Sequence, residues 1–256
     1  MSKQRFLFIF FGLLANLTLL AQDNDRLAFA QTADSVKALQ ISHTAYTVSW
    51  NSDLNIPNWV SHCLTRDEVT KKAVSRKNTF RTDPDVRNCP TTKEYTNSGY
   101  DRGHMAPSAD MLWDEYVQRE CFYMSNMCPQ IHNLNDGCWG DLENRARKLA
   151  KQYDSLYICA GPVVFKPSCV DRYIGNNYKI LVPRAFFKVF IVKVDGTWHG
   201  IGFVFTHEER PYGVDLKGYC YTIDEVERLT GIDFFYNLPD DIESKVESSF
   251  NYDIWK

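Results

Sequence analysis

Four consecutive residues, Asp101-Arg102-Gly103-His104, bring together side chains suited to acid–base chemistry on an anionic substrate. The unperturbed pKa of histidine lies near neutrality, so His104 can take a proton from water at working pH. Asp101 or a nearby carbonyl could fix the tautomer of that imidazole. Arg102 offers a permanently charged fork of donors for phosphate or carboxylate, and Gly103 permits a backbone approach that a side chain would block. A tetrapeptide of this kind could also be a surface turn, so its context decides.

Further polar residues follow downstream in a regular order. They are Ser125-Asn126-Met127-Cys128-Pro129-Gln130, then Leu134-Asn135, then Trp139, Leu142-Glu143 and Arg147. In order, type and spacing this chain resembles the DNA/RNA non-specific endonuclease family, whose pattern reads DRGH, SNxxPQ and LNxxxWxxLE. Similar segments lie upstream, at Asn58-Trp59-Val60, and downstream as far as Pro239, so the resemblance covers nearly all of the chain beyond its N-terminus.

The resemblance implies both a fold and an activity. The fold is α+β: an antiparallel core sheet with packed helices and a ββα-metal (His-Me finger) active site. The activity is hydrolysis of phosphodiester bonds in DNA and RNA, leaving 5′-phosphate ends. The cofactor is Mg²⁺, with Mn²⁺ as a substitute, because a hydrated, oxygen-rich shell suits these hard cations.

The same resemblance assigns the central roles residue by residue. His104 is the general base that deprotonates water, and Asn135 is the only direct protein ligand of the metal. Glu143 orients water near the metal, and Arg147 faces the phosphate. The competing interpretation of Glu143 and Arg147, which are four residues apart on one helix, is an ordinary solvent-facing ion pair.

Supporting roles follow for three more residues. Asn126 supports the site through hydrogen bonds, and Arg102 contacts phosphate or braces the loop. Arg76 is a candidate cation for the transition state, although Arg81 competes with it because the register of that segment is loose.

A zinc site is the alternative to this assignment. Cys128, His132 and Cys138 could ligate zinc, but no CxxC pair accompanies them. The dipeptide His132-Asn133 is similar to a fragment of HNH nucleases, but the DRGH motif already supplies a base.

The strands of the core can be located by their apolar runs. The apolar, β-prone run 155–165 predicts one strand. The runs 186–194 and 198–205 flank Asp195-Gly196, a strong hairpin signal. We expect these three strands to be central.

Two helices are predicted by spacing and by end signals. Apolar residues at helical spacing predict an amphipathic helix over 137–153, with Asn135 or Asp136 near its start. Thr222 and Glu225 form a capping box for a second helix, which Gly231 ends.

The N-terminus has the composition of a secretory signal peptide. Lys3 and Arg5 precede an apolar run that ends near Ala21 and is short for a membrane span. We therefore divide the chain into a signal peptide (1–21), a polar leader of uncertain order (22–38) and a nuclease domain (39–256). Cleavage after Ala21 fits best, with Ala30 as the later alternative. The expected location is secreted or periplasmic, with no membrane attachment after cleavage.

All eight cysteines lie in the exported part, and an even number in an exported chain predicts disulfide bonds. Spacing alone does not give their pairing, and nothing in the sequence gives an oligomeric state.

The formal net charge is −3 and becomes −5 once Lys3 and Arg5 are removed with the signal peptide. Binding of DNA and RNA must therefore rest on a local cationic cluster and be weak and salt-sensitive, which suits an enzyme better than a coating protein. Two rival functions use the same scaffold: a non-catalytic nucleic-acid-binding or surface protein, and a phosphodiesterase that acts on small substrates.

Overall fold

The structure, a computed structural model, describes residues 27–164, 172–208 and 213–256. The expected signal peptide, residues 1–21, lies outside these ranges. The strands are β1 (Ala30–Thr32), β2 (Leu39–Ser42), β3 (Thr47–Asn51), β4 (Ile56–Thr65), β5 (Asp101–His104), β6 (Met127–Gln130), β7 (Ser155–Val163), β8 (Arg172–Ile174), β9 (Ile180–Val182), β10 (Ala185–Val194), β11 (Thr197–Thr206), β12 (Cys220–Tyr221) and β13 (Ile232–Phe234).

The α-helices are α2 (Arg66–Thr70), α3 (Glu115–Glu120), α4 (Trp139–Tyr153), α5 (Ile223–Thr230) and α6 (Asp240–Ser248). Short helical turns are η1 (Thr92–Tyr95), η2 (Ser108–Asp110), η3 (Met124–Asn126), η4 (Leu134–Cys138), η5 (Leu216–Tyr219) and η6 (Tyr252–Trp255). None of the helices in the described ranges is long and apolar enough to cross a membrane.

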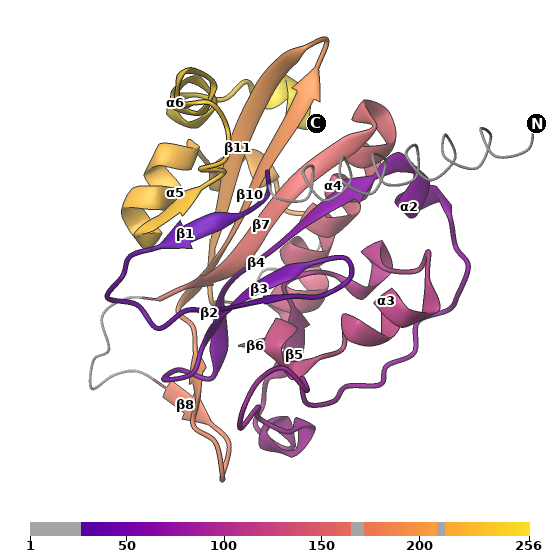
Figure 1. Cartoon of the computed structure of the whole chain (residues 1–256), viewed down its shortest axis with the longest axis vertical. Coiled ribbons are helices and arrows are strands. Elements are labelled where there is room, and N and C mark those ends of the chain that lie inside the picture. Colours follow the sequence, from indigo (N-terminus) through magenta and orange to yellow (C-terminus); the bar gives the residue numbers. More distant parts are fainter. Residues whose placement is uncertain (1–26, 165–171, 209–212) are drawn as a thin grey trace, which may run out of the picture.

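An antiparallel sheet in the order β12-β11-β10-β7-β4-β3-β2 forms the centre of the molecule (Figure 1). The predicted hairpin is present: β10 and β11 pair from Ala185↔Thr206 to Val194↔Thr197. Asp195 and Gly196 have φ values of 48° and 83°, the left-handed conformations that a tight hairpin turn requires. The predicted strand at 155–165 is β7, next to β10. The α+β fold class is confirmed.

The two faces of the sheet carry separate apolar cores, and the alternation of side chains along β10 shows how they divide. Phe186 and Phe190 pack into the core shared with α4, whereas Phe187 and Val189 pack into the core shared with α5 and α6. Lys188 is two residues from Phe186 and therefore points to the same face of the strand, which places a cation in the core shared with α4.

Helix α5 matches its prediction. Thr222 caps it in a capping box with Glu225, and Gly231 ends it with a left-handed φ of 70°. On β11, a Cβ at Gly200 would lie 2.6 Å from Ile223 Cδ1 and 2.7 Å from Val246 Cγ1. Glycine at this position therefore lets α5 and α6 pack directly on the strand.

The start of the long helix differs from the prediction. Helix α4 begins at Trp139, not Gly137, and a π-helical turn, η4, precedes it. Gly137 has a non-helical ψ of −122°, which breaks the helix at that residue. Asn135 consequently lies in the wide turn ahead of α4, and β5, β6 and α4 with this turn form the ββα unit.

The described part of the expected leader is structured, so the nuclease fold begins before residue 39. Strand β1 pairs with β13 in the register Ala30↔Phe234. Ala28 is fully buried, and Phe235 donates a backbone hydrogen bond to the carbonyl of Phe29. Short apolar side chains on the inner side of this segment explain how a polar stretch can pack against the domain.

The structure does not support the predicted disulfides: no bond joins any two of the seven described cysteines. Cys121, Cys128 and Cys159 are fully buried thiols, and burial raises the pKa of each. These residues act as small core side chains, which is the other common use of cysteine. Cys169 lies outside the described residues.

Candidate active site

A cavity of about 280 Å³ opens where β5, η2, η4 and α4 meet. Six of the seven residues predicted for the site line this cavity: Arg76, Arg102, His104, Asn135, Glu143 and Arg147. Asn126 does not line it. Gly103 is required next to the site because a Cβ there would collide with the side chain of Gln130 on β6.

His104 ends β5 and is 8% exposed. The rings of Phe80 and Phe122 lie 5.5 and 5.0 Å from the imidazole, centroid to centroid. Burial, assisted by the charge of Arg76, lowers the pKa of His104 to about 3. Its Nε2 is buried without a hydrogen-bond partner among the described residues. His104 is thus a neutral imidazole with its proton-accepting capacity unused.

Asp101 does not fix the tautomer of His104, contrary to the expectation from sequence. Its Oδ2 instead lies 3.0 Å from Asn135 Nδ2 and 2.9 Å from His132 Nδ1. Asp101 is the first residue of β5, and the chain that leaves β6 beside it continues into η4. The side chain of Asp101 therefore contacts residues after β6 and not His104 at the far end of its own strand. This contact raises the pKa of His132, which is exposed.

The hydrogen bond to Asp101 orients the amide of Asn135. With Nδ2 donating to Asp101, the Oδ1 atom is left as an acceptor with no donor among the described residues. Asn135 lines the cavity together with Glu143. An amide oxygen beside a carboxylate in a water-accessible cavity suits a hard, hydrated cation such as Mg²⁺.

Glu143 is paired with Lys188 and not with Arg147. Glu143 Oε1 lies 3.5 Å from Lys188 Nζ, which itself sits 4.1 Å from the centroid of the Trp139 ring. Burial raises the pKa of Glu143, against the opposing charge of Lys188, and burial lowers the pKa of Lys188. Lys188 was missed from sequence, although a lysine in the middle of an apolar strand was a signal.

One helical turn after Glu143, Arg147 makes an ion pair with the buried carboxylate of Asp110. Its Nη1 donates to Asp110 Oδ1 at 2.7 Å, and Asp110 Oδ2 lies 3.2 Å from His62 Nε2. Burial would raise the pKa of Asp110, but the hydrogen bond to His62 and the charge of Arg147 together lower it. Arg147 Nη2 also donates to Asn144. The competing interpretation, a solvent-facing ion pair between Glu143 and Arg147, is therefore wrong. Asp110 is a further residue missed from sequence.

Arg102 and Arg76 line the cavity from the side of His104. Arg102 Nη2 donates to the carbonyl of Thr92 at 2.7 Å, and its guanidinium lies over the rings of Phe80 and Tyr95. This contact braces the η1 loop while the side chain still borders the cavity. Arg76 lies over Phe122.

The competitor Arg81 points elsewhere. Arg81 Nη2 donates to the carbonyl of Arg119, and Arg81 does not line the cavity. Between the two candidates, Arg76 is the cation placed near His104.

Asn126 is fully buried and holds the backbone that carries the site. Its Oδ1 accepts from the Ala106 amide at 2.8 Å, and its Nδ2 donates to the carbonyls of Ala106 and Cys121. With all of its amide hydrogen bonds used, Asn126 positions the chain after His104 and cannot ligate a metal in the cavity.

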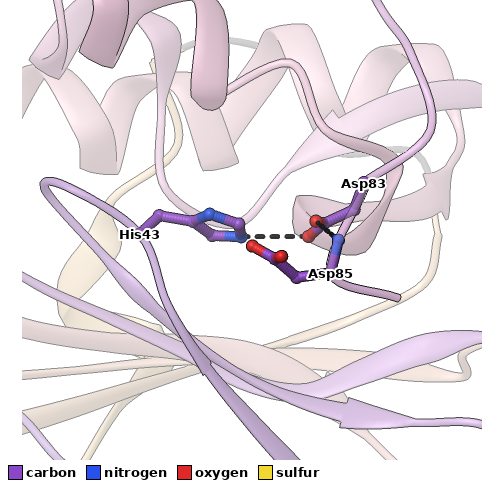
Figure 2. A group of neighbouring side chains, drawn as sticks. All are labelled: His43, Asp83 and Asp85. Atoms are coloured by element: carbon purple, nitrogen blue, oxygen red, sulfur yellow. Dashed lines mark hydrogen bonds and ion pairs between the residues drawn. The ribbon is translucent and has the colours of Figure 1, made fainter. Parts of the chain in front are cut away.

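A polar cluster of His43, Asp83 and Asp85 contacts Ser125, the neighbour of Asn126 in η3; Figure 2 shows the three cluster residues. His43 Nε2 lies 2.9 Å from Asp83 Oδ2, which also accepts from Ser125 Oγ, and Asp85 donates its backbone amide to Asp83 Oδ1. These three side chains, His43, Asp83 and Asp85, offer ligand atoms within 4.8 Å of one another. Because Asp83 is already satisfied by protein donors, the cluster serves to fix η3 and so Asn126.

The alternative zinc site is not formed. Cys128 and Cys138 are fully buried, whereas the side chain of His132 is 71% exposed and bonded to Asp101.

A second, larger hollow of about 740 Å³ adjoins the cavity and shares Ala109, Asn144 and Arg147 with it. Its remaining charged lining residues are Lys72, Arg145, Lys148, Lys151, Asp141 and Asp215. With Arg147, five cations face two carboxylates, so this groove is locally basic on an acidic protein.

Comparison with known proteins agrees with this geometry. The model of the DNA/RNA non-specific endonuclease family matches residues 25–241. The chain is 31% identical to a nuclease of Serratia marcescens over 223 residues, which cover 82% of this chain and 80% of that protein. It is 28% identical to human mitochondrial endonuclease G over 207 residues, which cover 77% and 69% of the two chains.

Among solved structures, a chain from the crystal structure of the EndoG/EndoGI complex matches with a TM-score of 0.74 and 30% identity, over 79% of this chain and 88% of that chain. The motif residues around the cavity, the antiparallel fold and these matches lead to one assignment. This chain belongs to the DNA/RNA non-specific endonuclease family and is a nuclease that hydrolyses nucleic acids.

Proposed function

We propose that this nuclease is an exported, Mg²⁺-dependent endonuclease that cuts DNA and RNA without reading the bases, with His104 as general base and Asn135 as metal ligand. One observation carries the proposal: a buried imidazole whose pKa is lowered and an amide oxygen with no donor among the described residues border the same water-accessible cavity. Mn²⁺ is expected to replace Mg²⁺, because both accept an oxygen-rich shell.

The chemistry follows from the cavity lining. When bound, the cation supplies positive charge to the phosphate oxygens. A ring nitrogen of His104 takes a proton from water, and the resulting hydroxide attacks phosphorus. The bond from phosphorus to the 3′ oxygen breaks, which leaves the phosphate on the 5′ end and a hydroxyl on the 3′ end once that oxygen takes up a proton.

The cations around the cavity would stabilise the negative charge that builds on phosphorus. Arg147 is fixed by Asp110, and Arg102 by Thr92, so both guanidinium groups are held before substrate arrives. The ion pair with Lys188 holds Glu143 in place in the cavity that Asn135 also lines. In that position Glu143 would orient water.

The basic groove favours a polymer as substrate over a small phosphodiester. It extends the row of cations from Arg147 to Lys148 and Lys151, beyond the space that one phosphate needs. These groups address the backbone and carry no base readout, which supports low sequence specificity.

Opening of a closed circular plasmid tests endonuclease action directly, because neither a binding protein nor an enzyme limited to small substrates or ends can open a circle. We expect nicking with Mg²⁺ and none after chelation. In the same assay His104→Ala should lose about 10² to 10⁴ in rate while folding and metal binding stay nearly intact. Retention of more than about a tenth of wild-type activity would exclude His104 as the base.

Asn135→Ala should behave differently from His104→Ala. Loss of the one direct protein ligand weakens metal binding, so raising Mg²⁺ or supplying Mn²⁺ should recover part of the nicking rate by mass action. No metal concentration replaces the missing base in His104→Ala. Calorimetry of Mg²⁺ binding gives the independent readout: unchanged affinity in Asn135→Ala would remove Asn135 as the ligand and point to Glu143.

Export rests on the N-terminal composition and is tested by the mass of the protein recovered outside the cytoplasm. Because Ala28 and Ala30 are buried in the fold, we expect cleavage after Ala21 and not after Ala30. A mature N-terminus at residue 31 would contradict that choice.

A further inference from the structure

A cluster of carboxylates lies far from the active site in sequence, between α5, β13 and α6. Asp224 and Glu227 come from α5, Asp233 from β13, and Glu243 and Glu247 from α6. They form two triads, Asp224 with Glu227 and Glu247, and Asp233 with Glu243 and Glu247. In each triad the ligand oxygens lie within 4.8 Å of one another. Glu247 belongs to both triads and is therefore the centre of the cluster.

Glu247 is a buried acid with an unsatisfied oxygen, which distinguishes this cluster from an ordinary acidic surface. Its side chain is turned into the cluster and the residue is only 8% exposed, yet its Oε1 is buried with no hydrogen-bond partner among the described residues. Glu243 Oε1 is unpartnered in the same way. A buried carboxylate oxygen without a donor is costly unless something else compensates it.

No cationic side chain in the described part of the chain compensates the cluster. In the described ranges, no lysine or arginine forms an ion pair with these five side chains. Arg228, on α5, donates to the backbone carbonyl of Asp224 and not to its carboxylate. The Phe234 amide donates a hydrogen bond to Glu227 Oε1 at 2.8 Å.

The energetic consequence agrees with this geometry. Burial, followed by the charges of neighbouring carboxylates, raises the pKa of Glu247 to about 9. Burial also raises the pKa of Glu227 to about 7. A cation bound among these oxygens would therefore compete with protons for them.

The ligand set selects the kind of cation. Oxygens at about 2.3–2.6 Å from Ca²⁺ lie no more than about 5.2 Å apart, so three oxygens within 4.8 Å of one another can share one such ion. Carboxylates drawn from three elements suit the larger and less regular shell of Ca²⁺ better than the strict octahedron of Mg²⁺.

We propose that Asp224, Glu227, Asp233, Glu243 and Glu247 form a structural Ca²⁺ site, with Glu247 as the shared ligand. The site is distinct from the catalytic cavity, and its cation joins α5, β13 and α6 on the sheet face opposite α4. Because β13 pairs with β1, bound Ca²⁺ also secures the N-terminal strand (Figure 1). Its role is stability, independent of catalysis.

The test uses the full chain carrying Asn135→Ala, so that metal binding at the catalytic cavity contributes little. After chelation and dialysis, calorimetry with Ca²⁺ should give a Kd at or below about 1 mM. Thermal unfolding should shift upward by about 2–4 °C at a Ca²⁺ concentration about five times that Kd. Absence of both the heat and the shift at about 10 mM Ca²⁺ would overturn the proposal.

Three variants in this background locate the site. Glu247→Gln keeps the shape of the side chain and cannot ionise, so it should fold, and it should weaken Ca²⁺ binding at least tenfold. Asp233→Asn, at an exposed position that cannot disturb the core, should also weaken binding. Asp241→Asn is the matched control, since Asp241 lies on the same helix outside both triads. Equal responses of Glu247→Gln and Asp241→Asn would show only diffuse attraction to an acidic surface and would overturn the proposal.

Discussion

His104 owes its protonation state to packing more than to hydrogen bonding. The aromatic rings of Phe80 and Phe122 exclude water from the imidazole, and Arg76 adds a positive charge nearby. Both effects disfavour the imidazolium, so the base form is present before substrate or metal arrives. The motif supplies the histidine, but residues outside the motif, on each side of it in the sequence, set its pKa.

This environment predicts an unusual pH dependence. Since the pKa of His104 is lowered to about 3, the base stays neutral as pH falls through the ordinary histidine range. We expect kcat/KM at saturating Mg²⁺ to show no inflection near about pH 6.5 that belongs to His104. An acid limb centred near that pH would mean that the imidazole is exposed to water in the substrate-free enzyme.

Arg76→Gln tests the second contribution. Removal of its charge should raise the pKa of His104, so any acid limb should move toward neutral pH. Arg81→Gln is the matched control, because Arg81 lies outside the cavity. A shift of equal size in both variants would contradict a local effect of Arg76.

At the scale of elements, one buried amide joins three segments. Asn126 in η3 bonds the backbone of Ala106, after β5, and of Cys121, after α3. Asn126→Ala leaves three buried backbone groups unsatisfied, so we expect a loss on the order of 3 kcal/mol in the free energy of unfolding. Urea denaturation measures this loss.

Activity of folded Asn126→Ala separates positioning from ligation. The nicking rate should fall because the chain after His104 is released, while the affinity for Mg²⁺ should stay close to that of wild type. A selective loss of Mg²⁺ affinity would contradict the positioning role of Asn126.

The pairing of β1 with β13 makes a second prediction at this scale. A chain that begins at residue 39 lacks β1 and uncovers the apolar surface that Ala28 and Ala30 occupy. We expect its unfolding free energy to fall on the order of 3 kcal/mol relative to a chain that begins at residue 22. Equal denaturation midpoints would show that residues 22–38 act only as a leader.

Local signals in the sequence predicted the elements whose ends are set by nearby residues. The Asp195-Gly196 turn and the Thr222 capping box need only their own neighbours, and both are present in the structure. The residue types around the cavity followed from motif spacing. What spacing did not give are contacts between distant segments: Lys188 with Glu143, Asp110 with Arg147, and Asp101 with Asn135.

Two expectations differ from the described structure for the same reason. The number of cysteines indicates a redox environment. The position of each thiol in the fold decides whether a second cysteine lies close enough for a disulfide bond. The described cysteines are not joined. The leader is polar by composition, so its sequence alone gives no sign of a strand. Its few alanines become buried because β13, near the other end of the chain, pairs with this segment.

At the scale of the molecule, an acidic chain binds a polyanion through one basic groove. The formal net charge is −3, so Arg145, Arg147, Lys148 and Lys151 along α4 must supply the attraction locally. If three to four phosphates are neutralised, affinity for duplex DNA should fall about 40- to 150-fold between about 50 and 200 mM salt. Binding of a labelled duplex to His104→Ala at several salt concentrations measures this slope.

The double substitution Lys148→Gln and Lys151→Gln should reduce the salt slope by about two, because each lysine neutralises about one phosphate. Lys93→Gln and Lys193→Gln serve as the control, because neither residue lines the groove. An unchanged slope in the groove variant would show that the nucleic acid follows another path.

The two edges of the central sheet have a consequence for handling the protein. Strand β2 has only four residues, so the edge that it forms offers a short ladder of unpaired backbone groups, and at the other edge β12 pairs with Gly202 and Phe203 of β11. Next to β12, helices α5 and α6 pack against β11. Short and covered edges resist strand addition between molecules. We therefore expect concentrated solutions to remain free of fibrils, and heat-induced precipitation to require unfolding first.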